Sequence, residues 1–244
     1  PRDGLQSIKT IMRTSDKLAW IDALYNAGWR EIEVGSFVST KLLPQMADTA
    51  LVVHHAVSLV GLTVMALVPN VRGAEAALKA GVHKLTIPVS ASEAHSLANV
   101  GKTCGDMVEE VHNIIALKNE IAGADEVGLS DTTGMANPEQ VRRLFKKVRA
   151  VIGDKTGAAH MHNTRGLGLA NCLAAFDVGV STFDSSLGGL GGCPYAPGAS
   201  GNVVTEDLVF MLEAMGVKTG VNLEKLMSAR AYLQSVLPRE PIYG

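Results

Sequence analysis

Short apolar runs alternate with amphipathic helical patterns along most of this 244-residue chain, and this alternation restricts the folds that it can adopt. Runs typical of strands occur at 31–35, 62–68, 84–89, 126–130, 158–162 and 182–186. Helical patterns occur at 16–26, 46–58, 73–80, 103–120, 138–151, 167–178 and 205–215. Strands separated by helices pair in parallel through right-handed crossovers. Because the strands are apolar and polar residues follow their ends, we expect an α/β protein with a (β/α)8 barrel rather than an open sheet.

The number of strands is smaller than a barrel requires. Six runs are clear, and a stub ending at Asp3 stands for a truncated first strand. After the helix at 103–120 the chain enters the next strand almost directly, although a βα unit needs about 30 residues. A closed barrel cannot lose one strand without changing its strand number, shear and tilt together. We therefore predict that one βα unit has been left out between Ala122 and Gly123, with a genuine deletion as the alternative.

Composition and charge exclude several classes of protein. Hydrophobic residues make up 47% of the chain, which suits a single catalytic domain of barrel size over residues 1–244. The net charge of −2 is unlike that of a protein that binds nucleic acid through many lysines and arginines. The most apolar region, 51–68, contains several polar residues, so we expect no membrane span. The three cysteines form no Cys-x-x-Cys pair, which argues against a disulfide framework and a structural zinc cluster.

His160 and His162 are the pair of side chains that points most clearly to chemistry. Residues i and i+2 of a strand project from the same face, so both imidazoles can aim at one point. Asp3 and Asn202 could add a carboxylate and an amide oxygen, because strand ends at one face of a barrel converge on one site. Such a set of nitrogen and oxygen ligands favours Mg²⁺ or Mn²⁺, with Zn²⁺ or Fe²⁺ as alternatives. A pair of structural or exposed histidines is the competing interpretation.

Four further side chains could act on a substrate bound at these strand ends. Arg2 could stabilise a developing oxyanion or enolate, or it could form a structural ion pair. Glu33 ends a strand among apolar neighbours and could bond Arg2 or a metal-bound water. Asp131 ends another strand, where a turn or helix-cap role is the alternative. Cys193 lies in the glycine-rich run 188–194, so a closing loop could bring its thiol to the substrate as an acid or base.

These motifs resemble those of the 3-hydroxy-3-methylglutaryl-CoA (HMG-CoA) lyase family, which belongs to the metal-dependent lyases and Claisen-condensing barrels. The resemblance extends over nearly the whole chain. Its most specific segments are 1–6, 36–39, 44–46, 130–132, 160–162 and 188–207. The resemblance implies that HMG-CoA, an acyl-CoA thioester, is cleaved to acetyl-CoA and acetoacetate, the chemistry of leucine degradation and ketone-body formation. It also implies a homo-oligomer, in the cytoplasm for a bacterial source or in the mitochondrial matrix for a eukaryotic one.

The resemblance further implies a role for each matched side chain. A divalent cation, Mg²⁺ or Mn²⁺, would be held by Asp3, His160, His162 and Asn202. Arg2 would face the thioester carbonyl and stabilise the enolate, and Cys193 would take part in proton transfer. Glu33 and Asp131 would complete the polar site, with Asp131 taking the proton of the substrate hydroxyl.

Two other functions compete with the lyase. Enzymes similar to isopropylmalate, citramalate and homocitrate synthases share the Arg-Asp-Gly start and the His-x-His strand, but they run the condensation and usually carry C-terminal extensions. A barrel that binds acyl-CoA without turnover is the second alternative. Acetyl-CoA release from HMG-CoA would distinguish the lyase from the synthases, and turnover of any kind would exclude the binding protein.

Overall fold

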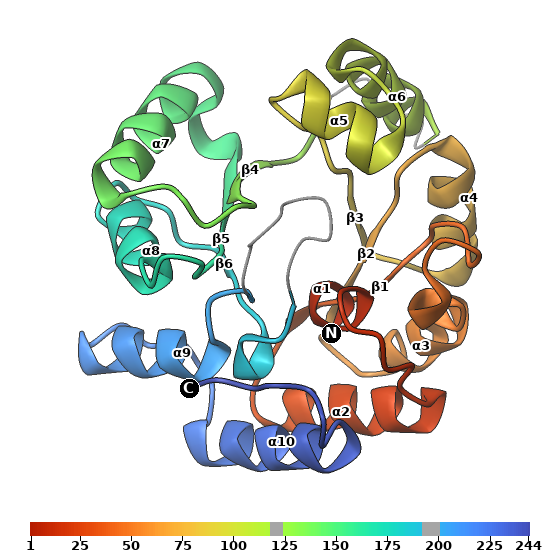
Figure 1. Ribbon diagram of the computed structural model, residues 1–244, viewed down its shortest axis with the longest axis vertical. Coiled ribbons are helices and arrows are strands. Elements are labelled where there is room, and N and C mark those ends of the chain that lie inside the picture. The colour runs from red at the N-terminus through yellow and green to blue at the C-terminus, as the bar shows by residue number, and fades with distance from the viewer. Residues whose placement is uncertain (118–123, 192–200) are drawn as a thin grey trace. The chain divides into compact units, whose positions relative to one another are not determined.

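The computed structural model describes residues 1–117, 124–191 and 201–244, and its contacts divide the chain into two compact units. Unit 1 comprises Pro1–Gly123 and Gly220–Arg239, and unit 2 comprises Ala124–Thr219 and Glu240–Gly244. Each unit contains a parallel three-stranded sheet with helices after its strands (Figure 1). The expected α/β class with parallel strands is therefore confirmed. That residues 1–244 act as a single catalytic domain stays a prediction.

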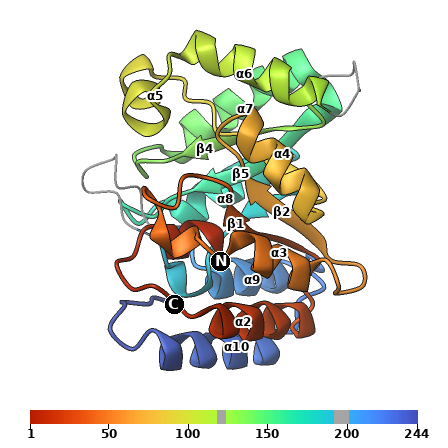
Figure 2. The ribbon, with the colours of Figure 1, turned by 90° about the vertical axis from the view of Figure 1, so that its right-hand side faces the viewer.

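The sheet of unit 1 has the order β1-β2-β3, with β1 at Glu31–Ser36, β2 at Thr63–Leu67 and β3 at Lys84–Thr86. Helices α3 (Thr49–Ala56) and α4 (Val71–Ala80) follow β1 and β2, and α3 contacts β1 (Figure 2). The central strand is fully buried at Val64 and Ala66, as expected for a parallel sheet covered by helices. Asn70 caps α4 by accepting a hydrogen bond from the Gly73 N–H, and Gly81 ends the helix in the left-handed conformation.

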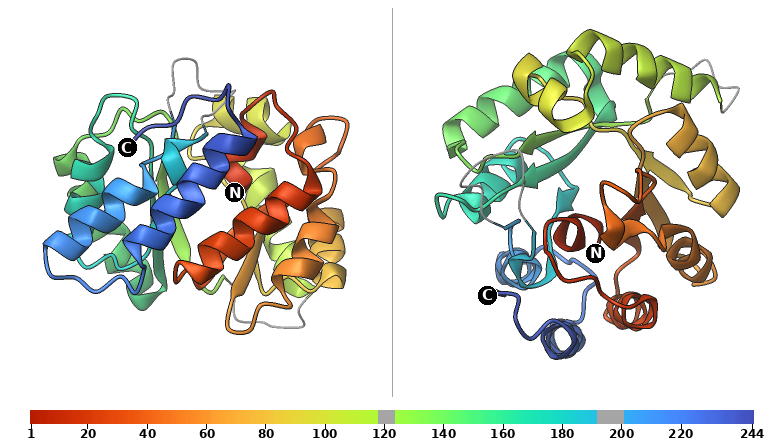
Figure 3. Two further views of the ribbon diagram at one scale, coloured as in Figure 1. Left: turned by 90° about the horizontal axis from the view of Figure 1, so that it is seen from below. Right: turned by 45° about the vertical axis from the view of Figure 1, so that its right-hand side comes forward.

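Two antiparallel helices, α2 (Thr14–Asn26) and α10 (Leu223–Val236), lie side by side in unit 1 (Figure 3). The Asn222 N–H donates to the Ala27 carbonyl at 2.7 Å, and the Tyr232 hydroxyl donates to Asp16 at 3.3 Å. Trp20 of α2 is almost completely buried. The C-terminal helix of the chain is therefore an integral part of the unit that contains the first residues.

The expected strand stub ending at Asp3 is wrong, because Arg2–Gln6 form the short helix α1. The Leu5 N–H donates to the Pro1 carbonyl at 3.1 Å, which is the hydrogen bond of a helical turn. Unit 1 also contains η1 (Pro44–Met46), α5 (Glu93–Val100) and α6 (Cys104–Ala116).

The sheet of unit 2 has the order β4-β5-β6, with β4 at Val127–Asp131, β5 at Thr156–Met161 and β6 at Phe183–Asp184. Its helices and short 3-10 turns are α7 (Pro138–Ile152), η2 (Gly153–Lys155), α8 (Gly168–Phe176), η3 (Leu187–Gly189) and α9 (Thr205–Ala214). The predicted start of α7 is confirmed, because Asn137 and Gln140 form a reciprocal capping box ahead of Pro138. Phe145, Ala159 and Met161 are buried in the core of this unit.

The residues that the structure describes contain six strands, so the predicted shortage of strands is confirmed for that part of the chain. Ala122 and Gly123, where we place the left-out unit, lie outside the described residues. Within the described ranges, no helix combines the length and the apolar character needed to cross a bilayer.

Candidate active site

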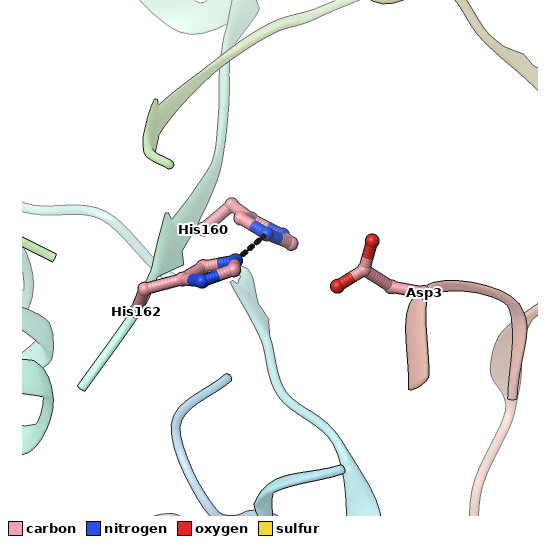
Figure 4. A group of neighbouring side chains, drawn as sticks. All are labelled: Asp3, His160 and His162. Carbon is pink, nitrogen blue, oxygen red and sulfur yellow. Dashed lines mark hydrogen bonds between the residues drawn. The ribbon is translucent and has the colours of Figure 1, made fainter. Parts of the chain in front are cut away.

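The two histidines lie at the carboxyl end of β5, on the face opposite the core of unit 2. Ala159 and Met161 are buried in that core, so the alternation of the strand turns His160 to the other face, and His162 follows directly after the strand. Their Nε2 atoms are 3.2 Å apart, and a dashed line marks this contact in Figure 4. The prediction that both imidazoles aim at one point is therefore confirmed.

Asp184 lies beside the histidine pair and was not predicted from the sequence. It lies on β6 directly opposite His160 in the parallel register, and its Oδ2 is 3.2 Å from His160 Nδ1. A carboxylate can only accept this hydrogen bond, so Nδ1 carries a proton, and when the ring is neutral its lone pair is on Nε2. The sequence contained a signal for this contact, because Asp184 ends the strand that follows the histidine strand. Spacing along the chain does not, however, set the register between these two strands.

Asn202 comes next to His162 through an isolated antiparallel β-bridge. The Val203 N–H donates to the Met161 carbonyl at 3.1 Å, and the Asn163 N–H donates to the Gly201 carbonyl at 3.2 Å. These two bonds fix the backbone on either side of Asn202 at the end of β5. The side chain is buried, and its Nδ2 donates to the Leu190 carbonyl at 3.3 Å. This bond orients the amide so that the carbonyl oxygen, the atom with ligand character, points away from Leu190.

The histidine pair has the chemistry and spacing that a divalent cation requires. Two ligands at right angles, each about 2.1 Å from an ion, lie about 3.0 Å apart, close to the 3.2 Å between the two Nε2 atoms. A neutral His160 with its proton on Nδ1 offers Nε2 as a ligand atom there, and its Nδ1 has the carboxylate partner that commonly orients a metal-bound histidine. The donor set of unit 2 thus fits a metal ion.

Asp3, Arg2 and Glu33 form an ion-pair network in unit 1. Arg2 donates from Nη1 to Asp3 Oδ1 at 2.6 Å and from Nε to Glu33 Oε2 at 2.5 Å. Asp3, also drawn in Figure 4, projects from α1 and accepts a further hydrogen bond from Gln6 Nε2 at 3.1 Å. The prediction that Glu33 bonds Arg2 is confirmed. Glu33 Oε1 is buried and has no hydrogen-bond partner among the described residues, so this oxygen can accept from a bound water or substrate.

Asp131 forms the turn between β4 and α7. Its carboxylate accepts hydrogen bonds from the backbone N–H groups of Met135 at 3.2 Å and Ala136 at 3.0 Å. Gly134, with φ at +65°, allows the chain to reverse between them. The turn role that we gave as the alternative is therefore present, and the catalytic role of Asp131 stays a prediction.

Cys193, the predicted loop thiol, lies outside the described residues, which omit 192–200. Cys172 is buried in α8, as expected for a core residue, and burial raises the pKa of its thiol to about 12. Glu206 was not singled out from the sequence. It is buried at the start of α9, and both of its carboxylate oxygens accept from the Gly188 N–H, at 3.1 and 3.0 Å. This bond fixes the turn with which the glycine-rich run begins.

The chain matches the family model described as HMGL-like in two segments, 1–122 and 107–233. It is 38% identical to the hydroxymethylglutaryl-CoA lyase YngG of Bacillus subtilis, over 96% of this chain and 90% of that protein. It is also 38% identical to the mitochondrial hydroxymethylglutaryl-CoA lyase of Macaca fascicularis, over 98% of this chain and 84% of that protein. Among solved structures it resembles an HMG-CoA lyase of A. baumannii in complex with coenzyme A and 3-methylmalate. That similarity has a TM-score of 0.93 at 37% identity and covers 99% of this chain and 90% of that one.

The chain therefore belongs to the HMGL-like family. Its likeness to HMG-CoA lyases, which the motifs predicted, is confirmed, and so is the (β/α)8 class, with the barrel incomplete in the described strands. The alignment with the Bacillus protein extends over 268 residues and is longer than this chain, so that relative has residues for which this chain has no counterpart. The two matched segments overlap at residues 107–122, close to the position where a βα unit was predicted to be left out.

Proposed function

We propose that this chain is a divalent-metal-dependent carbon–carbon lyase that cleaves HMG-CoA to acetyl-CoA and acetoacetate. The observation that carries the proposal is the near full-length similarity to HMG-CoA lyases, in a chain that holds an Arg-Asp pair and a histidine pair oriented for a cation. Asp3, His160, His162 and Asn202 are the proposed ligands, with Mg²⁺ or Mn²⁺ as the ion. When bound, such an ion polarises the oxygens that it contacts and orients the substrate.

The side chains of this chain match the demands of the reaction. Cleavage removes the proton of the tertiary hydroxyl, the oxygen forms the ketone of acetoacetate, and the carbon–carbon bond pair moves to the acetyl thioester as an enolate. The enolate carbon then takes up a proton, so the overall reaction is balanced without a redox partner. Asp131 is the proposed acceptor of the hydroxyl proton and Cys193 the proposed donor to carbon.

Arg2 and Glu33 are proposed to act on the thioester end of the substrate. Arg2 is almost completely buried, and its guanidinium is fixed by Asp3 and Glu33, so its positive charge has a defined place. A fixed cation that needs no rearrangement stabilises a developing enolate more effectively than a mobile one. The buried Glu33 Oε1 provides an acceptor beside it.

The direct test measures acetoacetate formed from HMG-CoA with Mg²⁺ or Mn²⁺, coupled to NADH oxidation by a 3-hydroxybutyrate dehydrogenase. We expect turnover that EDTA abolishes, that His160→Ala and Arg2→Met reduce at least about 100-fold, and that His54→Ala on the exposed face of α3 leaves unchanged. Condensation of acetyl-CoA with 2-oxo acids, and not cleavage, would overturn the proposal in favour of a synthase. Tight acyl-CoA binding without turnover would identify the binding protein.

The βα unit that we predict to be left out is tested by a second variant in the same assay. In this variant the corresponding unit of a relative is inserted between Ala122 and Gly123. It distinguishes two reasons for a lack of turnover: an incomplete barrel and a wrong substrate. If only the inserted form cleaves HMG-CoA, the substrate is correct and the unit is required. If neither form cleaves it, the proposed activity is wrong.

Three further properties belong to this proposal. The acyl-CoA thioester is the partner, consistent with the coenzyme A in the similar A. baumannii structure. We propose a homo-oligomer, which light scattering would test. The similar proteins come from a bacterium and from mitochondria, so we propose the cytoplasm for a bacterial source and the mitochondrial matrix for a eukaryotic one.

A further inference from the structure

We propose that Asp184 is a positioning residue that holds His160 in the tautomer whose Nε2 is able to bind a metal ion. The inference rests on the proposed metal-dependent function, and it concerns a residue outside the proposed ligand set. Asp184 ends β6, the short strand beside β5, and it lies opposite His160 in the parallel register. Its side chain projects from the same face of the sheet as His160, because paired residues of parallel strands share a face.

The geometry determines which imidazole nitrogen carries the proton. Asp184 Oδ2 is 3.2 Å from His160 Nδ1, and a carboxylate offers only acceptor atoms. His160 Nδ1 is therefore the donor, and in the neutral ring Nε2 keeps the lone pair. In the metal-free protein this lone pair accepts the hydrogen bond from His162 Nε2, 3.2 Å away, and His162 would give up that proton when the proposed cation binds. Without Asp184, His160 can place its proton on Nε2 itself, which removes this ligand atom from the metal position.

The burial of the two partners distinguishes a positioning role from a stabilising one. The side chain of Asp184 is 50% exposed, whereas that of His160 is 18% exposed. Solvent screens a pair with so exposed a carboxylate, so the pair contributes little to folding stability. A mostly buried ring still needs a hydrogen-bond partner on the correct nitrogen to be oriented. Removal of such a partner typically lowers metal affinity or activity about 10- to 100-fold.

The experiment compares Asp184→Ala and Asp184→Asn with the wild-type chain and with Asp177→Asn. Asp177 is a matched control, because it is a carboxylate of unit 2 with similar exposure, 43% against 50% for Asp184, that pairs with Arg142 instead of a histidine. Mn²⁺ affinity is measured by the electron paramagnetic resonance signal of free Mn²⁺. The tautomer of His160 is read from nitrogen-15 spectra of the metal-free protein, with His160→Gln to assign the signal.

We expect Asp184→Ala to weaken Mn²⁺ binding about 10- to 100-fold and to reduce the population of the Nδ1–H tautomer of His160. Asp184→Asn keeps an acceptor oxygen and should restore most of both properties, and Asp177→Asn should change neither. Unchanged urea unfolding of the Asp184 variants is expected as well, because the pair is exposed.

An Asp184→Ala chain that binds Mn²⁺ within about twofold of wild type with the same His160 tautomer would overturn the inference, and so would a wild-type chain that binds no Mn²⁺. If the affinity and the tautomer change as expected in a protein that forms no acetoacetate, the inference stands and only the proposed substrate fails.

Discussion

Replacement of Arg2 by lysine tests whether the network of unit 1 depends on the shape of the guanidinium or only on its charge. Arg2 donates through two different nitrogens to two carboxylates, Asp3 and Glu33, whose side chains are 19% and 20% exposed. A lysine ammonium is a single point charge on a flexible chain and cannot reproduce this fork. We therefore expect Arg2→Lys to lose one of the two charge-assisted hydrogen bonds and Arg2→Met to lose both.

The magnitudes follow from the number of bonds lost. One charge-assisted hydrogen bond contributes about 1.5–3 kcal/mol, so Arg2→Lys should lower the free energy of unfolding by about 2 kcal/mol. Arg2→Met leaves two mostly buried carboxylates without their cation, for which the cost is about 3–5 kcal/mol. With a urea m-value of about 2 kcal/mol/M, the lysine variant should unfold at about 1 M lower urea than the wild-type chain.

Tryptophan fluorescence reports the unfolding of unit 1, the unit that contains Arg2, because both tryptophans of the chain, Trp20 and Trp29, belong to it. Arg13→Lys is the matched control. Arg13 pairs with Asp16, but its side chain is 79% exposed, so its replacement should cost at most about 1 kcal/mol. If Arg2→Lys and Arg13→Lys have the same unfolding midpoint, the guanidinium fork does not stabilise unit 1 and the reasoning is wrong.

Other predictions concern unit 2. Asn137→Ala removes the capping box of α7 and should lower the free energy of unfolding by about 1 kcal/mol in urea titrations, whereas no loss would show that the cap is not needed. Gly134→Ala places a Cβ 2.5 Å from the hydroxyl oxygen of Thr164 and should cost more than Gly166→Ala, which has a similar positive φ but open space; equal losses would attribute the whole effect to φ. The thiol of Cys172 has a pKa raised by burial to about 12, so the folded chain keeps its proton while the unfolded chain ionises from about pH 8.5. Stability from this group is therefore complete below about pH 8.5 and falls as the pH rises toward 12, and Cys172→Ala should flatten that slope in urea unfolding at pH 8 to 11.

The sequence predicted the parts of the fold that depend on local pattern. The Asn137-Pro138 start of α7 could be located because a capping residue followed by proline has a local physical cause. The orientation of His160 and His162 to one face followed from the period of a strand. By contrast, α5 was missed because it is a segment of only eight residues with two large apolar side chains, Leu97 and Val100, and Ser96 is its only buried residue. Its start signal, the Ser92 cap, was present but has little weight for so short a segment.

The parts of the site that depend on pairing between distant segments could not be predicted from spacing. Asp184 meets His160 through strand register, and Glu206 meets Gly188 across 18 residues. The double use of Arg2 as a link between Asp3 and Glu33 was anticipated only in part, because the contact with Glu33 needs the fold of unit 1. The prediction of a strand stub ending at Asp3 was wrong because a strand needs hydrogen bonds to a neighbouring strand, whereas a helical turn forms its hydrogen bonds within the same segment.

The two-residue strand β6 makes the chemistry of this protein sensitive to errors in folding. A shift of β6 by one position along β5 would bring Phe183 opposite His160 in place of Asp184 and turn every side chain of the strand to the wrong face. A chain trapped in that alignment would retain its helices and most of its buried surface. It would look native by circular dichroism and yet lack the partner of its imidazole, so a preparation of uniform secondary structure could still contain inactive molecules.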